Sequence, residues 1–430
     1  MSQALKVALA GLGTVGGGTA ALLAEQAELL ALRAGRPIEL VAAANLEKPK
    51  DVPLGKAAFF TDARQMVAET SFDVLVELIG GAQGIALDIA KAALAKGRSV
   101  VTANKAMIAH HGVELAALAE ANGATLAFEA SVGGGIPIIK TLREGLAGNR
   151  IRSVMGILNG TCNYILTTMR ASGRDFADVL AEAQKLGYAE ADPGFDIDGI
   201  DTAHKLAILA SLAFATPVAI DKVACEGIRH VSALDIQYAD ELGYRIKLLG
   251  VARQTGQGIE QRVYPAMVPL SFPLAHVDGV FNAIVTEGDF VGRSVLEGRG
   301  AGARPTASAV VADLVDLARG RSVPAFGVPV TALKTQPAAP NEAHASAYYI
   351  RLMVKDQPGV FADIAAALRD EKVSMEQIIQ RGRSPGATVP VVMTVHETVE
   401  AAMLRALARI GKLAALAEPP RLIRIEAPTA

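Results

Sequence analysis

The chain has 430 residues, which suggests two or three domains, and a hydrophobic content of 51% can fill several cores. Its 42 Lys and Arg residues nearly balance 44 Asp and Glu residues, and it contains 7 Tyr, 12 Phe and no Trp. Nucleic-acid-binding proteins usually have a basic domain and aromatic stacking platforms, so this composition argues against a nucleic-acid partner.

The cysteines and the apolar runs bear on the compartment. Cys162 and Cys225 have neither metal-ligand spacing nor the pattern of a disulfide framework, so we expect two free thiols. The first apolar stretch runs straight into glycines, unlike a signal peptide. The uncharged run 206–220 is too short to cross a bilayer as a helix. We therefore expect a cytoplasmic protein with no membrane partner.

In the first third of the chain, short apolar runs alternate with helical patterns. The expected strands are 6–10, 38–44, 72–79, 99–103 and 125–132. The expected helices are a long one ending near 34, then 83–96 and 112–122. This alternation predicts an α/β domain with a Rossmann-type doubly wound parallel sheet over residues 1–136.

The pattern changes after Pro137 to that of an α+β unit, roughly residues 137–303. Its expected strands are 152–158, 244–253, 259–268 and 280–286, and its expected helices are 176–186 and 200–214. A helix at 308–319, within the segment 304–333, is expected to return to the first domain. Strands 244–253, 259–268 and 280–286 look consecutive and antiparallel.

The last part of the chain follows a Pro- and Ala-rich stretch, residues 334–347, which looks like a linker. Residues 348–430 then show strands 348–354, 373–380, 389–394 and 421–425 and helices 359–368 and 399–410. The order βαββαβ predicts a ferredoxin-like domain.

A glycine loop follows the first expected strand. Gly11, Gly13 and Gly16 fit the spacing G-x-G-x-x-G between a strand and a helix. Such glycines allow a tight turn, a close approach of the backbone to a pyrophosphate and close helix–strand packing, while the helix N-terminus offers free amides. This arrangement predicts a dinucleotide site.

The end of the second strand usually distinguishes NAD from NADP. Asn45 stands where a ribose-binding carboxylate is typical, and Lys48 and Lys50 follow it. This favours NADP, although Glu47 and the absence of Arg leave NAD open, and a solvated turn is an alternative.

Three stretches carry residue types that catalysis needs. Lys105 follows the fourth strand, where doubly wound sheets bind ligands. The glycines 133–135 could bring backbone carbonyls to a hard cation, or act as a domain hinge. Five acids between 190 and 201 precede a core-bound helix in which Asp201 and Lys205 are four residues apart. These suit proton transfer, but a helix dipole and a simple ion pair explain them equally well.

Several longer motifs occur together in one order. They are GLGTVGGG at 11–18, TANKA at 102–106, EASVGGGIP at 129–137, GILNGTCNYIL at 156–166, LGYAEADP at 186–193, DIDGIDTAHK at 196–205 and GAGARPTASAVVAD at 300–313. With them, the chain resembles bacterial-type homoserine dehydrogenases that carry a C-terminal ACT domain. The resemblance implies NAD(P)-dependent interconversion of L-homoserine and L-aspartate 4-semialdehyde in threonine, methionine and isoleucine biosynthesis.

The resemblance also implies residue roles. Lys205 is implied as the proton donor and acceptor, with Lys105 at the cofactor and substrate, and Glu190, Asp201 and Asp196 are implied to bind homoserine. The implied cofactor contacts are Gly11, Leu12, Gly13, Thr14, Val15, Gly16, Gly80, Lys105, Gly187 and Gly302. A sodium ion is implied on the backbone carbonyls of Glu129, Val132, Gly134 and Ile136.

The tail sequence YYIRLMVKDQPGVFADIA at 348–365 resembles the start of an ACT domain. Such domains bind small amino acids, so threonine is implied as an effector, and the 137–303 unit is implied to dimerise, giving a homodimer or homotetramer. Two alternatives stay open: a different Rossmann–ACT oxidoreductase, such as a prephenate dehydrogenase, and a non-catalytic amino-acid sensor.

Overall fold

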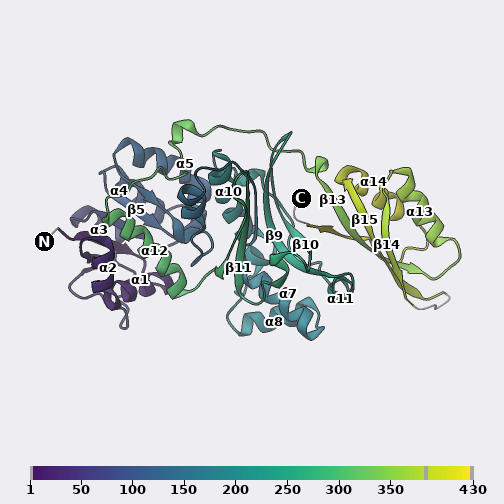
Figure 1. The fold of residues 1–430 in the computed structure, drawn as a ribbon. Helices are drawn as coiled ribbons and strands as arrows, with labels where there is room; N and C mark the ends of the chain where they lie inside the picture. The colour runs from purple at the N-terminus through teal and green to yellow at the C-terminus, as the bar shows by residue number, and fades with distance from the viewer. Residues whose placement is uncertain (1–2, 382–385, 427–430) are drawn as a thin grey trace.

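The computed structural model describes residues 3–381 and 386–426, which form three units in a row (Figure 1). Residues 1–2 of the first expected domain and residues 382–385 and 427–430 of the last lie outside the described residues. In the described part, no helix has the length and apolar character needed to cross a membrane. Cys162 and Cys225 are both free thiols.

Six parallel strands form the N-terminal sheet, in the order β3-β2-β1-β4-β5-β6. The strands are β1 (Leu5–Ala10), β2 (Ile38–Ala44), β3 (Ala58–Phe60), β4 (Val74–Glu77), β5 (Ser99–Thr102) and β6 (Leu126–Ala127). The helices are α1 (Thr14–Glu25), α2 (Ala27–Ala34), α3 (Ala63–Glu69), α4 (Ile85–Leu94) and α5 (Lys105–Ala121). This order is that of dinucleotide-binding sheets, so the Rossmann-type prediction is confirmed.

One helix returns to this sheet from much later in the chain. Helix α12 (Ala303–Ala318) packs against α1, and a Cβ on Gly18 would lie 2.7 Å from the Ala303 carbonyl oxygen. Only glycine fits this contact, so α1 and α12 approach each other backbone to backbone.

The central unit is built on a mostly antiparallel sheet with helices on one face. Its strands are β7 (Ile151–Ile157), β8 (Ala224–Cys225), β9 (Tyr244–Thr255), β10 (Gly258–Pro269), β11 (Phe281–Gly288) and β12 (Gly292–Arg299). Its helices are α6 (Ile138–Lys140), α7 (Gly160–Ser172), α8 (Phe176–Lys185), α9 (Gly194–Ile197), α10 (Ile200–Phe214) and α11 (Ala233–Glu241), with a π-helical turn at Thr141–Gly145. Helix α10 contacts β7, β9 and β10 and is buried along nearly its whole length.

The C-terminal unit has the predicted βαββαβ order. It comprises β13 (Ala345–Lys355), α13 (Val360–Asp370), β14 (Met375–Gln380), β15 (Thr388–Val399), α14 (Glu400–Ile410) and β16 (Arg421–Ile425). The strands pair in the order β16-β13-β15-β14, all antiparallel. Helices α13 and α14 pack on each other beside this sheet, as in a ferredoxin-like domain.

The central and C-terminal sheets are continuous. Strand β16 pairs in parallel with β10 through Ala266–Arg424 and Met267–Ile425, giving one sheet of ten strands. The segment 334–347, expected as a linker, is also attached: the Ile259 amide donates to the Pro337 carbonyl at 2.9 Å, and Ala339 donates back to Ile259 at 2.9 Å. The C-terminal domain is therefore docked on the central sheet and not tethered by a free spacer.

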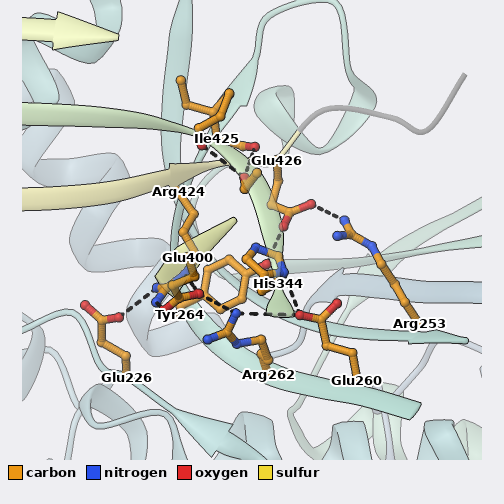
Figure 2. Close-up of polar contacts among 12 residues, drawn as sticks. Glu226, Arg253, Glu260, Arg262, Tyr264, His344, Glu400, Arg424, Ile425 and Glu426 are labelled. Atoms are coloured by element: carbon orange, nitrogen blue, oxygen red, sulfur yellow. Dashed lines mark hydrogen bonds and ion pairs between the residues drawn. The ribbon is translucent and has the colours of Figure 1, made fainter. Parts of the chain in front are cut away.

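Charged side chains cross this junction in pairs (Figure 2). Glu400, the first residue of α14, accepts hydrogen bonds from Arg262 of β10 at 2.7 Å and from Arg424 of β16 at 2.5 Å. The His344 ring lies 2.6 Å from Glu260, and Glu426 pairs with Arg253. Because buried charges are costly without partners, these pairs make the two domains depend on each other.

Candidate active site

A cavity of about 610 Å³ lies between the N-terminal domain and the central sheet. Its wall is formed by the turns after β1, β5 and β6, the β7–α7 turn, helix α10 and the loop before α12. Ligands of doubly wound sheets bind at the carboxyl ends of the strands, which is where this cavity lies. Eight of the predicted residues line it, and four of these have charged side chains: Lys105, Asp196, Asp201 and Lys205.

The glycine loop reaches this cavity at Val15. Gly11 has φ +91°, and a Cβ there would lie 2.6 Å from the Leu78 carbonyl carbon; a Cβ on Gly16 would lie 1.9 Å from the Gly11 oxygen. A Cβ on Gly13, in contrast, would meet nothing within 4 Å, so this position faces open space. Helix α1 begins at Thr14 without a side-chain cap, and Val15 lines the cavity. The loop therefore has the room and the free amides that a pyrophosphate needs.

The end of β2 contacts this loop directly. The Asn45 side chain accepts a hydrogen bond from the Leu12 amide at 3.1 Å and donates to the Glu47 carbonyl at 2.8 Å. The Lys48 ammonium lies 5.8 Å from the centre of the Phe59 ring, and Lys50 is exposed. The contact between the end of β2 and the glycine loop is therefore made by an uncharged side chain.

The turn after β4 is held by a buried carboxylate. Glu77 accepts hydrogen bonds from the amides of Ile79 at 2.7 Å and Gly80 at 3.1 Å, and from the Thr102 hydroxyl at 2.7 Å. Gly80 has φ +90° and is not among the residues that line the cavity. Glu77 therefore fixes Gly80 relative to the end of β5.

Asp201 lies between the two predicted lysines. Its Oδ2 is 2.8 Å from the Lys205 ammonium and its Oδ1 is 3.2 Å from that of Lys105. Lys205 also donates to the Leu158 carbonyl at 2.7 Å. Lys105 is the first residue of α5, which begins seven residues before the expected helix, and its side chain is 32% exposed against 11% for Lys205. Lys205 is held firmly, whereas Lys105 faces the cavity more openly.

The electrostatics of this group favour an ionised Asp201. Burial alone raises the pKa of the carboxyl, but the charges of Lys205 and Lys105 and the hydrogen bonds from Lys205 and Asn159 outweigh it and lower the pKa to about 2. Asp196 differs, because burial raises its pKa and the Asn159 hydrogen bond only partly opposes that rise. The two carboxylates thus sit in different electrostatic environments.

Asn159 was not predicted as a site residue, yet it lines the cavity. Its amide nitrogen donates to Asp196 at 2.8 Å and to Asp201 at 2.8 Å, and its oxygen accepts the Cys162 amide at 2.8 Å. The available signal was an Asn directly before a helix, which is typical of an N-cap. That signal predicts the cap of α7 but not the contact with two distant carboxylates.

The segment 187–201, which carries the five acids, lines the cavity only in part. Gly187 and Tyr188 line the cavity, and the Phe195 ring lies 5.5 Å from the Lys105 ammonium. Glu190 is exposed and is not among the lining residues. The structure therefore groups Asp196 and Asp201 with the lysines but leaves Glu190 outside this group.

The glycine run after β6 forms a tight loop against the segment before α12. Gly134 lines the cavity with φ +53°, and a Cβ there would lie 2.5 Å from the Gly300 carbonyl carbon. Gly302 lines the cavity beyond it. The Ile136 amide donates to the Gly133 carbonyl at 2.9 Å, and the Ile136 carbonyl accepts the Ile138 amide at 2.8 Å. Val132 and Ile136 have buried side chains, so only their backbone can serve a ligand.

The Glu129 carboxylate has a structural role beside this loop. It accepts the amides of Ile139 at 2.9 Å and Lys140 at 2.8 Å. Burial and the nearby Asp313 raise its pKa to about 7. Among residues 3–381 and 386–426, no group of three or more His, Cys, Asp or Glu side chains is placed to bind a metal.

These features define the class of protein, which is a dinucleotide-dependent oxidoreductase. They are a Rossmann-type sheet, a glycine loop with free amides, and a group of lysines and carboxylates at the carboxyl ends of the strands.

Comparison with known proteins gives the family. The family model "Homoserine dehydrogenase" matches residues 137–315, "Homoserine dehydrogenase, NAD binding domain" matches 11–129, and "ACT domain" matches 348–412. The chain is 48% identical to the homoserine dehydrogenase of Neisseria gonorrhoeae over 429 residues, covering 98% of each chain. The Pseudomonas aeruginosa homoserine dehydrogenase is 47% identical, covering 98% of this chain and 99% of the relative.

Solved structures agree with the sequence comparison. A homoserine dehydrogenase crystal structure from Thiobacillus denitrificans superposes with a TM-score of 0.93 at 46% identity, covering 99% of this chain and 98% of the other. A hyperthermophilic archaeal homoserine dehydrogenase in complex with NADPH has a TM-score of 0.63 at 30% identity, covering 73% of this chain. The chain belongs to the homoserine dehydrogenase family, which confirms the resemblance and the oxidoreductase function.

Proposed function

We propose that Lys205 carries the proton in the interconversion of L-homoserine and L-aspartate 4-semialdehyde, with Lys105 beside the cofactor and the substrate. The nicotinamide cofactor, when bound, accepts or supplies the hydride. An alcohol that loses hydride also loses its hydroxyl proton, so a base must stand at that oxygen. Lys205 suits this role because Asp201 and the Leu158 carbonyl hold its amino group in one place. As the neutral amine it accepts the hydroxyl proton when homoserine is oxidised, and as the ammonium it donates a proton when the semialdehyde is reduced.

The substrate ammonium needs negative charge, and the cavity supplies it. Asp196 and Asp201 both line the cavity, and we assign the ammonium to this side of it. Glu190, on the exposed loop three residues after the cavity-lining Gly187, is included in this proposal as a further carboxylate for the ammonium.

The cofactor is proposed to bind along the glycine loop, with NADP used at least as well as NAD. We assign the dinucleotide contacts to the loop residues Gly11, Leu12, Gly13, Thr14, Val15 and Gly16. Further contacts are assigned to Gly80, Lys105, Gly187 and Gly302. Support for NADP comes from the uncharged Asn45 at the end of β2 and from the nearby ammonium groups of Lys48 and Lys50.

A monovalent cation, sodium in this proposal, would be held by the backbone carbonyls of Glu129, Val132, Gly134 and Ile136. The left-handed φ of Gly133 and Gly134 folds this loop tightly between the cofactor domain and the central unit. A cation there would tie the two halves of the site together.

Regulation is proposed to act through the C-terminal domain, with L-threonine as the effector. A cavity of about 240 Å³ lies at the β13–α13 loop and is lined by residues that include Gln357, Pro358 and Val360. Its size suits a small amino acid. We also propose a homodimer or homotetramer as the working assembly.

The observation that carries the catalytic proposal is the position of Asp201 between both lysines in the cavity wall. The test is to follow reduction of NADP or NAD with L-homoserine in the intact protein and in Asp201→Asn. Wild type should turn over and Asp201→Asn should lose most of that turnover. Wild-type turnover in Asp201→Asn would remove the proposed role of this group.

A further inference from the structure

Asn159 occupies the turn between β7 and α7, at the floor of the cavity. Its side chain is buried, with 5% of the residue exposed. The amide oxygen accepts the backbone N–H of Cys162 at 2.8 Å and so caps α7. Because an amide oxygen can only accept and an amide nitrogen can only donate, this cap fixes which way the side chain faces. The nitrogen must point to the cavity.

Two carboxylates accept hydrogen bonds from that nitrogen. It lies 2.8 Å from Oδ1 of Asp196 and 2.8 Å from Oδ2 of Asp201, so each amide hydrogen serves one acid. Like charges this close repel each other, and a donor shared between them lowers the cost of keeping both ionised. A neutral donor achieves this without adding a positive charge that would compete with a substrate ammonium.

Leu158, the residue before Asn159, binds the lysine that pairs with Asp201. The Leu158 carbonyl accepts Lys205 at 2.7 Å, while Asp201 accepts Lys205 and Asn159 on the same oxygen. The β7–α7 turn therefore holds both members of the Asp201–Lys205 pair, one through a carbonyl and one through an amide. Both contacts come from a segment about forty residues earlier in the chain.

We propose that Asn159 is a positioning residue that keeps Asp196 and Asp201 side by side as an ionised pair, ready for the substrate ammonium and aligned with Lys205. This inference rests on the roles proposed above for these residues. Other charged or titratable groups also face the pair. They are Lys105 of α5, Cys162 of α7, and His204 and Lys205 of α10.

The hydrogen bonds from Asn159 act on both acids in one direction. Burial raises the pKa of Asp196, and the Asn159 bond opposes that rise. The same amide contributes to the lowered pKa of Asp201, after the larger effects of burial and the two lysines. Removing the donor should therefore shift both acids toward protonation at a higher pH.

Three variants separate this role from helix capping. Asn159→Asp and Asn159→Ser both keep a good cap for α7, because Asp and Ser accept the Cys162 amide as well as Asn does. Asp replaces the donor with a third carboxylate, whereas Ser removes the amide donor and adds no charge. The matched control is Asn163→Asp, one turn further along α7, where the buried amide donates to the carbonyls of Val277 and Phe281 outside the cavity.

The measurement is kcat and KM for L-homoserine as a function of pH, because kcat/KM reports groups of the free enzyme. We expect Asn159→Asp to lose about tenfold or more in kcat/KM at neutral pH, the size of a lost hydrogen bond to a charged group. The acid side of its pH profile for kcat/KM, the acid limb, should move to a higher pH by about 1 unit or more. Asn159→Ser should raise KM more than it lowers kcat, with a smaller movement of the acid limb.

Two results would overturn the proposal. One is an acid limb in folded Asn159→Asp that matches wild type; the other is an equal movement in Asn163→Asp, which would show a general effect on the fold. Lys205→Ala distinguishes the wider assignment. If Lys205→Ala keeps wild-type turnover, the proposed catalytic roles fail. If it is inactive while Asn159→Asp keeps the wild-type profile, only the positioning role fails.

Discussion

The Asp201 carboxylate lies 2.8 Å from the Lys205 ammonium, one turn earlier in α10. An exposed pair at this spacing contributes only about 0.3–0.5 kcal/mol to a helix. Here the two side chains are 6% and 11% exposed, so burial would make an unpartnered charge costly. The site supplies partners to both groups. The pair is thus maintained by the surrounding fold, which is typical of a functional group more than of a helix-stabilising contact.

Loss of either site lysine should reduce turnover while the fold survives. We expect Lys205→Ala and Lys105→Ala each to lower kcat about 100- to 10,000-fold, the usual contribution of a positioned proton-transfer group. Lys247→Met is the matched control, because Lys247 is also buried and bound to an aspartate, Asp278, at 3.0 Å, but lies outside the cavity. Steady-state assays with circular dichroism as a fold check decide this. Near-normal kcat in Lys205→Ala would contradict the assignment.

The role of Glu190 can be tested by whether removing its charge changes KM, kcat or both. If its carboxylate binds the substrate ammonium, Glu190→Gln should raise the KM for L-homoserine and leave kcat nearly unchanged. Asp192→Asn is the control, since Asp192 is an exposed acid on the same loop that accepts the Gly194 amide at 3.1 Å. An unchanged KM in Glu190→Gln would leave Asp196 and Asp201 as the ammonium ligands.

Elements bounded by clear Gly or Pro turn signals were predictable from the sequence. Strand 38–44, helix 200–214 and strand 421–425 were expected with the bounds that the structure shows. Several elements were not expected, among them β3, α3, α7, α11 and β12. Strand β3 has only three residues at the sheet edge, too few to show alternation. Helix α7 places Cys162, Ile165, Leu166 and Met169 on one buried face at helical spacing, but this stretch was read only as part of a longer motif and was not assigned a helix.

Long-range contacts in the site were not predictable in the same way. The spacing of Asp201 and Lys205 places them on one helix face, as expected. The contacts of Asn159 with Asp196 and Asp201 depend instead on how the β7–α7 turn packs against α10, which no local pattern specifies. The pairing of β16 with β10 is similar, because it joins residues more than 150 positions apart.

Cofactor choice should depend on the lysines after β2. Lys48 and Lys50 changed together to Ala should weaken NADP more than NAD, because only NADP has a 2′-phosphate for an ammonium to pair with. Lys56→Ala, an exposed lysine before β3, is the control. The measurement is the ratio of kcat/KM values for the two cofactors. An equal loss for both cofactors would show that these lysines do not contact the 2′-phosphate.

A cation requirement follows if the carbonyls around Gly134 bind sodium. In a buffer whose only cation is tetramethylammonium, turnover should fall, because that ion is too large for a cage of carbonyl oxygens. Sodium chloride should restore the rate, whereas tetramethylammonium chloride at the same ionic strength should not. Recovery with both salts would indicate a general effect of ionic strength.

The docking of the C-terminal domain changes how its regulation has to be tested. Cutting the chain near Pro340 would remove β16 from the edge of β10 and leave Arg262 without Glu400. Removing one partner of a buried ion pair costs about 3–5 kcal/mol, so such a truncated chain would lose stability whatever threonine does. A substitution within the domain is a cleaner probe.

Threonine inhibition should depend on the cavity at the β13–α13 loop. Val360→Phe places a larger side chain in its wall and should weaken inhibition by L-threonine about tenfold or more, while turnover without threonine stays at the wild-type level. Leu404→Phe is the control, because Leu404 is 46% exposed on α14 and lies outside this cavity. Allosteric coupling of about 1–3 kcal/mol requires that threonine bind one state better than another, so the inhibition should not be simply competitive with homoserine. Full, competitive inhibition in Val360→Phe would show that threonine acts at the homoserine site. Absence of inhibition in the wild type would leave the C-terminal domain as a sensor of another amino acid or as part of the assembly interface.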